Sequence, residues 1–238
     1  MTGNNNYTED QKIIRENYEK ILSRVREAAA RSGREPGEIK VIAVSKTVTA
    51  DRVKTAFDAG LTDFGENRVQ ELCDKTDILD IGCNWHLIGH LQTNKVKYIA
   101  DRVSMIHSLD SLELADEIRK RAQKAGRRMD VLVQVNVAGE ESKFGIKPEE
   151  TLEFVKAVGK MENIKVKGLM TIAPMAENPE NIRWVFANLR KLLIDIRKEN
   201  IDNIDMDYLS MGMSNDFEVA IEEGSNMVRI GTALFGKR

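Results

Sequence analysis

Short apolar runs alternate with amphipathic segments along most of the chain. From Lys40 onward, runs rich in β-branched and other apolar residues recur, each followed by a segment able to form a helix. Apolar runs of about four to eight residues between turn signals are typical of strands. The expected strands are eight in number and span residues 41–46, 63–67, 85–89, 105–110, 131–137, 166–172, 208–212 and 227–231.

A helical pattern precedes the first expected strand. Apolar residues recur at helical spacing from Ile14 to Ala29, and Thr8 with Gln11 has the spacing of a capping box. Gly33 and Pro36 end this pattern. The residues before it are polar, so we expect a flexible tail at residues 1–6, followed by one domain spanning residues 7–238.

Residues suited to helix boundaries lie between the expected strands. A small polar residue at the start of a helix can accept a hydrogen bond from a free amide, and glycine commonly follows the last turn. The expected start and stop pairs are Thr49 with Gly60, Asp110 with Gly126, and Ser214 with Gly224.

Repeated strand–helix units require parallel strands that are covered by helices. An open, doubly wound sheet also produces this pattern. Eight strands in 238 residues match a closed barrel, which typically has about 250 residues. We therefore predict the α/β class and a single (β/α)8 TIM barrel with an extra N-terminal helix.

Composition and charge restrict the partners. The chain has 36 basic and 38 acidic side chains, a formal net charge of −2, so no net positive field favours a nucleic acid or an anionic membrane. Cys73 and Cys83 lack metal-ligand spacing, and no long uncharged apolar run interrupts the chain. We expect a cytoplasmic protein with no membrane or nucleic-acid partner.

Candidate chemistry collects where the expected strands end. In barrels of this kind the active site lies at the carboxyl ends of the strands, and loops after strands seven and eight commonly hold phosphate. Gly212 permits close backbone approach, and Ser214 is expected to begin a helix with free amides. Gly231 and Thr232 offer a second group of donors. Each feature alone is a common turn, but together they favour a phosphate site.

Arg229 is expected to point into the barrel. Strand alternation places Val228 and Ile230 on one face and Arg229 on the other, so the guanidinium lies inside if the aliphatic pair faces the helices. A buried cation needs a partner. That partner is either an internal carboxylate, such as Glu66 or Glu71, or a ligand atom.

Lys46 ends the first expected strand and has two interpretations. Lysines at strand ends often extend into solvent. Apolar walls and the nearby Arg229 would instead disfavour the charged amine, leaving a nucleophile able to condense with an aldehyde. No metal site is expected, because His86 and His90 lie in a strand-like run and lack the glutamate of a zinc helix.

The segment 138–147 follows the fifth expected strand and is glycine-bounded. Glu140, Glu141 and Lys143 make it polar. It is either a solvated loop or a lid over the site.

Five segments resemble one known family over nearly the whole chain. They are Val41–Lys46 (VIAVSK), Phe64–Glu71 (FGENRVQE), Trp85–Lys95 (WHLIGHLQTNK), Leu209–Ser214 (LSMGMS) and Val228–Gly231 (VRIG). These motifs are similar to those of the pyridoxal 5′-phosphate (PLP) homeostasis proteins. The resemblance implies a barrel related to the N-terminal domain of alanine racemase, with PLP held as an internal aldimine.

The resemblance also implies roles for individual residues. It places the aldimine on Lys46 and Arg229 near the pyridine nitrogen, with Asn67 as a neighbour of the ring. The phosphate site that it implies consists of Ser210, Ser214, Gly231 and Thr232.

The resemblance finally implies a carrier and regulator of PLP that affects amino-acid and keto-acid pools, with PLP-dependent apo-enzymes as possible recipients. Arginine only donates hydrogen bonds, so beside the pyridine nitrogen it makes the ring a weak electron sink. Similar racemases carry a further domain with a catalytic tyrosine, whereas only two residues follow Gly236 in this sequence. We therefore expect a monomer without strong catalytic activity. A weakly active racemase-like PLP enzyme and a phosphosugar-type barrel enzyme without PLP are the alternatives.

Overall fold

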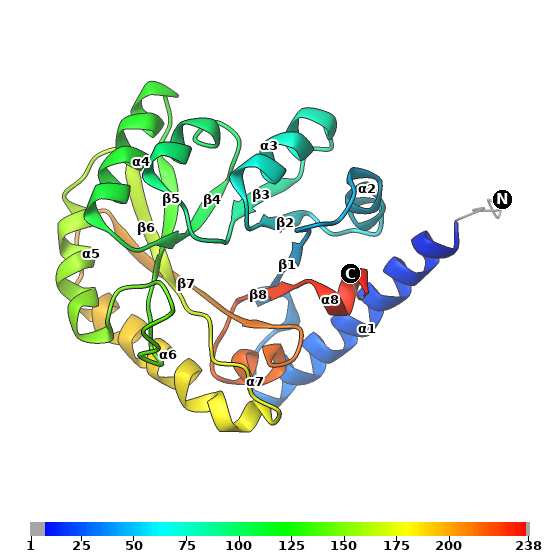
Figure 1. Ribbon diagram of the computed structural model, residues 1–238. Coiled ribbons are helices and arrows are strands. Elements are labelled where there is room, and N and C mark those ends of the chain that lie inside the picture. Colours follow the sequence, from blue (N-terminus) through cyan, green and yellow to red (C-terminus); the bar gives the residue numbers. More distant parts are fainter. Residues whose placement is uncertain (1–7, 237–238) are drawn as a thin grey trace.

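The computed structural model describes residues 8–236 and forms a closed barrel of eight parallel strands, in chain order (Figure 1). The strands are β1 (Lys40–Val44), β2 (Asp63–Glu66), β3 (Asn84–Leu87), β4 (Met105–Leu109), β5 (Met129–Gln134), β6 (Ile164–Met170), β7 (Ile204–Met213) and β8 (Met227–Ile230). The first and last strands close the barrel, with Ala43 opposite Ile230. The predicted barrel is confirmed, and the predicted tail at residues 1–6 lies outside the described residues.

Helices follow most strands and surround the barrel in Figure 1. The α-helices are α1 (Glu9–Arg31), α2 (Ala50–Asp58), α3 (Val69–Ile78), α4 (Leu112–Lys124), α5 (Thr151–Gly159), α6 (Arg183–Lys198), α7 (Phe217–Glu222) and α8 (Thr232–Phe235). The 3₁₀-helices are η1 (Pro36–Glu38), η2 (Thr93–Tyr98), η3 (Pro148–Glu150) and η4 (Pro179–Ile182). Between β3 and β4 the barrel is therefore covered by 3₁₀-helix instead of an α-helix.

The extra helix α1 packs against the last helices of the chain. Its capping box is present, since Thr8 accepts the amide of Gln11 and the Gln11 side chain accepts the amide of Thr8. The side chain of Asn17 donates to the carbonyl of Leu234 at 3.0 Å. Because α8 has only four residues, α1 supplies much of the cover on this side, and the C-terminal end lies beside it in Figure 1.

Two of the predicted helix starts are wrong. Ser214 does not cap α7, which begins at Phe217 after Asp216, because its hydroxyl accepts the amide of Ala233 instead. Asp110 does not cap α4, because the next residue, Ser111, accepts the amide of Leu114. Both helices end next to the predicted glycines.

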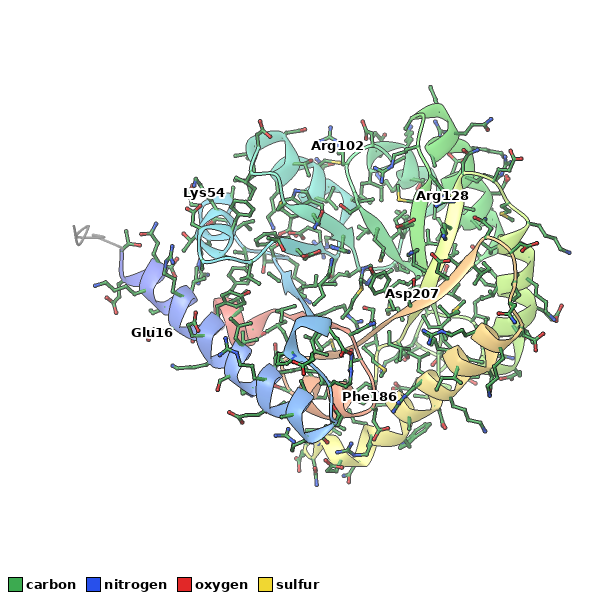
Figure 2. All side chains as sticks on the ribbon, turned by 180° about the vertical axis from the view of Figure 1, so that it is seen from behind. Glu16, Lys54, Arg102, Arg128, Phe186 and Asp207 are labelled. Carbon is green, nitrogen blue, oxygen red and sulfur yellow. The ribbon has the colours of Figure 1, made fainter. Side chains whose placement is uncertain are left out.

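Side chains are buried on both faces of the strands. A large apolar cluster lies between the strands and the helices, and it includes Phe64, Leu87 and Phe186, the last of which is labelled on α6 in Figure 2. A smaller cluster of inward-facing side chains includes Ile42 and Met227. Within residues 8–236, no helix is long and apolar enough to cross a bilayer.

Candidate functional site

A cavity of about 310 Å³ opens at the carboxyl ends of the strands. Residues at or just after the ends of β1, β2, β3, β6, β7 and β8 form its walls. Of the residues predicted for the site, those lining the cavity are Lys46, Asn67, Ser214, Arg229, Gly231 and Thr232. The fold thus brings together residues that are up to 186 positions apart, counting from Lys46 to Thr232.

Lys46 lies in a tight turn just after β1. The next residue, Thr47, has a φ of 60°, a left-handed conformation that is uncommon for a residue with a side chain. The Thr47 amide donates to the carboxylate of Glu71 on α3, and the Thr47 hydroxyl donates to the carbonyl of Lys46. The turn is therefore held by a contact from outside itself, which fixes where the Lys46 side chain enters the cavity.

A buried ion-pair cluster lies behind this turn. Lys75 on α3 donates to the carboxylates of Glu66 and Glu71. It also donates to the carbonyl of Ser45 at 2.5 Å, while the hydroxyl of Ser45 donates to Glu66 at 2.7 Å. Burial raises the pKa of Glu66 despite these hydrogen bonds. The cluster joins the end of β1 to α3.

Asn67 follows β2 and lies against the end of β3. A Cβ atom placed on Gly89 would come within 2.4 Å of the Asn67 carbonyl oxygen. Only glycine permits this approach of the two backbones. Gly89 therefore allows the Asn67 backbone to sit at the wall of the cavity.

Arg229 points into the barrel, as strand alternation predicted, and is 4% exposed. Its guanidinium donates to the Ser210 hydroxyl at 2.6 Å and to the Thr171 carbonyl at 2.8 Å. Burial lowers the pKa of Arg229 to about 10, which leaves it charged at neutral pH. Glu66 and Glu71 are not its partners, because they bind Lys75 instead, and the carboxylate whose charge acts on Arg229 is that of Asp216 on the cavity wall.

Ser210 is the predicted site residue that the structure does not bring to the cavity wall. It is fully buried on β7, beneath Arg229, and its hydroxyl also lies 3.0 Å from Nδ1 of His107. His107 in turn contacts His86, so the histidine that sequence reasoning paired with His90 has a different partner. No cluster of metal ligands occurs among residues 8–236.

The loops after β7 and β8 meet at the cavity. The hydroxyl of Ser214 accepts the amide of Ala233 at 3.3 Å, which joins the two loops. Gly231 precedes α8, and Thr232 is the first residue of that helix, so its amide has no acceptor one turn earlier. Hydroxyl and amide donors therefore converge on one side of the cavity, where the sequence predicted a phosphate site.

Gly212 makes this loop arrangement possible. Its φ is 91°, and a Cβ atom there would lie 2.6 Å from Cβ of Ala220 and 2.9 Å from Cα of Phe217. The end of β7 can thus lie directly on α7.

Some wall residues were missed by sequence reasoning. Asp216 lines the cavity and accepts the Met213 amide at 2.5 Å, and burial raises its pKa. The loop after β6 contributes Ile172, Pro174 and Met175, with Met175 96% exposed at the rim. The sequence offered one signal for these wall residues, namely that they follow the end of a strand. Every loop at the carboxyl ends of the strands shares that signal, so it does not single them out.

The segment 138–147 is not part of the cavity wall. It is fastened at several points, since the Gln134 side chain donates to the Phe144 carbonyl and Ile146 pairs with the end of β5. The half-exposed ring of Phe144 stacks on His90, with ring centroids 3.7 Å apart.

Comparisons with known proteins show the family and the fold of the chain. The family model for the N-terminal domain of alanine racemase matches residues 14–238. The chain is 49% identical over 224 residues to the pyridoxal phosphate homeostasis protein of Aquifex aeolicus, covering 94% of this chain and 97% of that protein.

Solved structures show the same likeness. A protein of unknown function from Bifidobacterium adolescentis is similar at a TM-score of 0.91 and 35% identity, covering 95% of this chain and 96% of that one. PipY of Synechococcus elongatus PCC7942, solved with PLP bound, is similar at a TM-score of 0.77 and 32% identity, covering 89% of this chain and 100% of that one.

Proposed function

We propose that this chain, which belongs to the pyridoxal phosphate homeostasis protein family, binds PLP in the cavity at the carboxyl ends of the strands and serves PLP homeostasis. The observation that carries the proposal is the convergence of a primary amine, a buried guanidinium and a group of hydroxyl and amide donors on one cavity. PipY, whose whole length matches this chain, has been solved with PLP bound.

The residues present fit the cofactor. A cavity of about 310 Å³ is within the range of small-molecule sites. PLP supplies an aldehyde that forms a Schiff base with a primary amine. Among the described residues that line the cavity, Lys46 is the lysine, so it is the amine to which we assign attachment.

The remaining contacts divide between the phosphate and the ring. We assign the phosphate to the joined loops of Ser214, Gly231 and Thr232, whose donors suit an anion. Arg229 would donate to the ring nitrogen, and Asn67 would lie beside the ring, since both line the cavity. Ser210 acts beneath the cavity, through Arg229.

The same side chains support a carrier and regulator instead of a strong catalyst. Arg229 remains charged and can only donate, so beside the ring nitrogen it would disfavour protonation of that nitrogen. Racemisation needs acid–base groups on both faces of the substrate. Besides Lys46, the described wall residues include one carboxylic acid, Asp216, which accepts the Met213 amide, and neither a tyrosine nor a histidine. We assign the protein to the cytoplasm as a monomer, with PLP-dependent apo-enzymes as recipients.

Attachment at Lys46 tests the binding proposal. Purified protein supplied with PLP should absorb visible light, and borohydride reduction should fix the cofactor to the peptide that contains Lys46. Lys46→Ala should abolish both signals, while Lys54→Ala, on the outer face of α2 (Figure 2), should retain them. A colourless wild-type protein that PLP cannot reconstitute would reject PLP binding and favour a phosphosugar-type barrel.

Two further measurements test the role. Incubation of the PLP-loaded protein with amino acids in deuterated water should give no exchange of the α-proton at enzyme-like rates; exchange at such rates would establish a racemase-like enzyme. Transfer of PLP to an apo-enzyme in the presence of a trap for free cofactor should proceed; complete inhibition by the trap would reject direct delivery.

A further inference from the structure

We infer that Asp63, His86, His107 and Ser210 form a one-directional hydrogen-bond chain through the barrel that positions Arg229 for the cofactor. The inference rests on the proposed function, because it assigns Arg229 to the PLP ring. It gives a role to two fully or nearly fully buried histidines that line no part of the cavity.

The chain runs from the amino end of the barrel to the cavity. Asp63 is the first residue of β2, and its Oδ1 lies 3.0 Å from Nε2 of His86. Nδ1 of His86 lies 2.9 Å from Nε2 of His107, whose Nδ1 lies 3.0 Å from the Ser210 hydroxyl. The Ser210 hydroxyl accepts a hydrogen bond from the Arg229 guanidinium at 2.6 Å. Four adjacent contacts thus connect side chains from β2, β3, β4, β7 and β8.

The far end of the chain is fixed as an acceptor. Asp63 is also bound by Lys40 at 3.0 Å and by the Thr62 hydroxyl at 2.8 Å. Burial alone would raise the pKa of Asp63, but the hydrogen bonds from His86, Lys40 and Thr62 hold it well below its usual range. An ionised carboxylate only accepts, so Nε2 of His86 carries a proton.

The other end is fixed as a donor. Arg229 remains charged, so its N–H groups donate to the Ser210 oxygen. Burial, with His86 and Arg229 nearby, lowers the pKa of His107 well below its ordinary value, so this ring is neutral and carries one proton.

Only one arrangement of protons satisfies every group between these ends. Ser210 accepts from Arg229 and, because a guanidinium cannot accept, donates its hydroxyl proton to Nδ1 of His107. His107, which carries one proton, then holds it on Nε2 and donates it to Nδ1 of His86. The reverse order would give Ser210 two incoming N–H groups and leave its own buried proton without an acceptor in the chain, at a cost in free energy.

This direction matters at the cavity. Ser210 is held as an acceptor, and the Thr171 carbonyl is a second acceptor 2.8 Å from the same guanidinium. Together they fix the plane of the guanidinium, and its remaining N–H donors serve the cavity that Arg229 lines. The two histidines and Asp63 are therefore positioning residues that act through Ser210.

The direction of the hydrogen bonds can be measured without mutating any of the residues that form them. The sequence contains only His86, His90 and His107, so ¹⁵N-imidazole NMR of the PLP-loaded wild-type protein gives few signals, and His90→Gln assigns one of them. We expect both His86 and His107 to carry a proton on Nε2 and none on Nδ1. A proton on Nδ1 of His107 would reverse the chain and overturn the inference.

Variants at the two ends test the link to the cofactor. Ser210→Ala removes the acceptor for Arg229 and should weaken PLP retention about ten-fold or more. It should also shift the pH titration of the bound cofactor's absorbance. Ser210→Thr keeps the hydroxyl and should restore both. Asp63→Asn, at the far end, should shift the same titration although Asp63 does not touch the cavity.

A neighbouring serine provides the matched control. Ser108 on β4 is fully buried, and its hydroxyl has no hydrogen-bond partner among the described residues. Ser108→Ala should leave PLP retention and the titration unchanged. Wild-type retention and titration in both Ser210→Ala and Asp63→Asn would overturn the inference and leave the proposed function intact. Failure of the wild-type protein to bind PLP would overturn both.

Discussion

The Nζ atom of Lys75 lies 2.5 Å from the carbonyl oxygen of Ser45, the residue immediately before Lys46. On the other side of Lys46, the Thr47 amide donates to Glu71, one turn before Lys75 on α3. Both neighbours of Lys46 are thus fastened to the same helix. The Lys46 amine is therefore presented to the cavity from a fixed backbone position, which suits the attachment role that we propose for it.

Lys75→Met should therefore weaken both the fold and PLP retention. The substitution leaves Glu66, which is fully buried, without its cation and releases the Ser45 carbonyl. Removing one partner of a buried ion pair costs about 3–5 kcal/mol, and urea unfolding should show a loss of that order. Borohydride trapping at Lys46 should fall in the protein that remains folded.

An exposed ion pair provides the control for Lys75. Lys198 pairs with Asp195 on α6, and its side chain is 70% exposed. Lys198→Met should change the free energy of unfolding by less than about 1 kcal/mol. Equal losses in the two variants would show that the cluster behind Lys46 contributes no more than a surface pair.

The stability of the protein should decrease in mild acid because of His107. Its folded pKa is lowered, chiefly by burial, whereas an unfolded histidine titrates near about 6.5. As the pH falls through that value, the unfolded chain takes up a proton that the folded chain does not. The free energy of unfolding should therefore fall by up to about 1.4 kcal/mol per pH unit from this group.

Comparison with His107→Gln isolates this contribution. The lowered pKa of Asp63 contributes stability that is present above its unfolded value of about 3.9 and is lost only as the pH falls below it, so between about pH 4.5 and 6.5 the difference in slope reports His107. Urea unfolding at several pH values in that window should show the shallower slope in the variant. Parallel slopes would mean that His107 is charged in the folded protein.

Gly212→Ala should disrupt the cavity loop after β7. The new Cβ atom would lie 2.6 Å from Ala220, in addition to the strain of a φ of 91°. Gly82 has a φ of 65° but no atom within 4 Å of an added Cβ, so Gly82→Ala has the strain without the clash. We expect Gly82→Ala to lower the free energy of unfolding by about 1–2 kcal/mol. Gly212→Ala should lower it by more and should also reduce PLP retention. Equal losses would contradict the close packing of β7 on α7.

Most strands were readable from the sequence because they are short apolar runs with a parallel partner on both sides, although β2 (Asp63–Glu66) carries an acidic residue at each end. Strand alternation also placed Arg229 inside the barrel. Its contacts with Ser210 and Thr171 could not be predicted, since they depend on how β6, β7 and β8 align, and the register shifts within both strand pairs. Register is set by packing across the whole barrel and not by any one strand.

The sequence signals for helix starts gave two wrong predictions. Asp110 and Ser111 are both suitable helix caps, and only the backbone of the preceding strand decides which one faces the free amide. Ser214 has cap chemistry but contacts α8, which is contributed by the last strand–helix unit. The histidine chain was missed for a related reason: each member is an ordinary inward residue of its own strand, and only barrel closure brings them together.

Thr232→Val should weaken PLP retention while leaving the fold intact. Valine keeps the shape of threonine but removes the hydroxyl that we assign to the phosphate, and hydrogen bonds to charged groups contribute about 1.5–3 kcal/mol. Retention should therefore fall about ten-fold or more in equilibrium dialysis. Thr93 is also the first residue of a short helix, η2, but does not line the cavity, so Thr93→Val should retain PLP as the wild type does. Wild-type retention in Thr232→Val would exclude this hydroxyl from the phosphate site and leave the backbone amides and Ser214 to hold the anion.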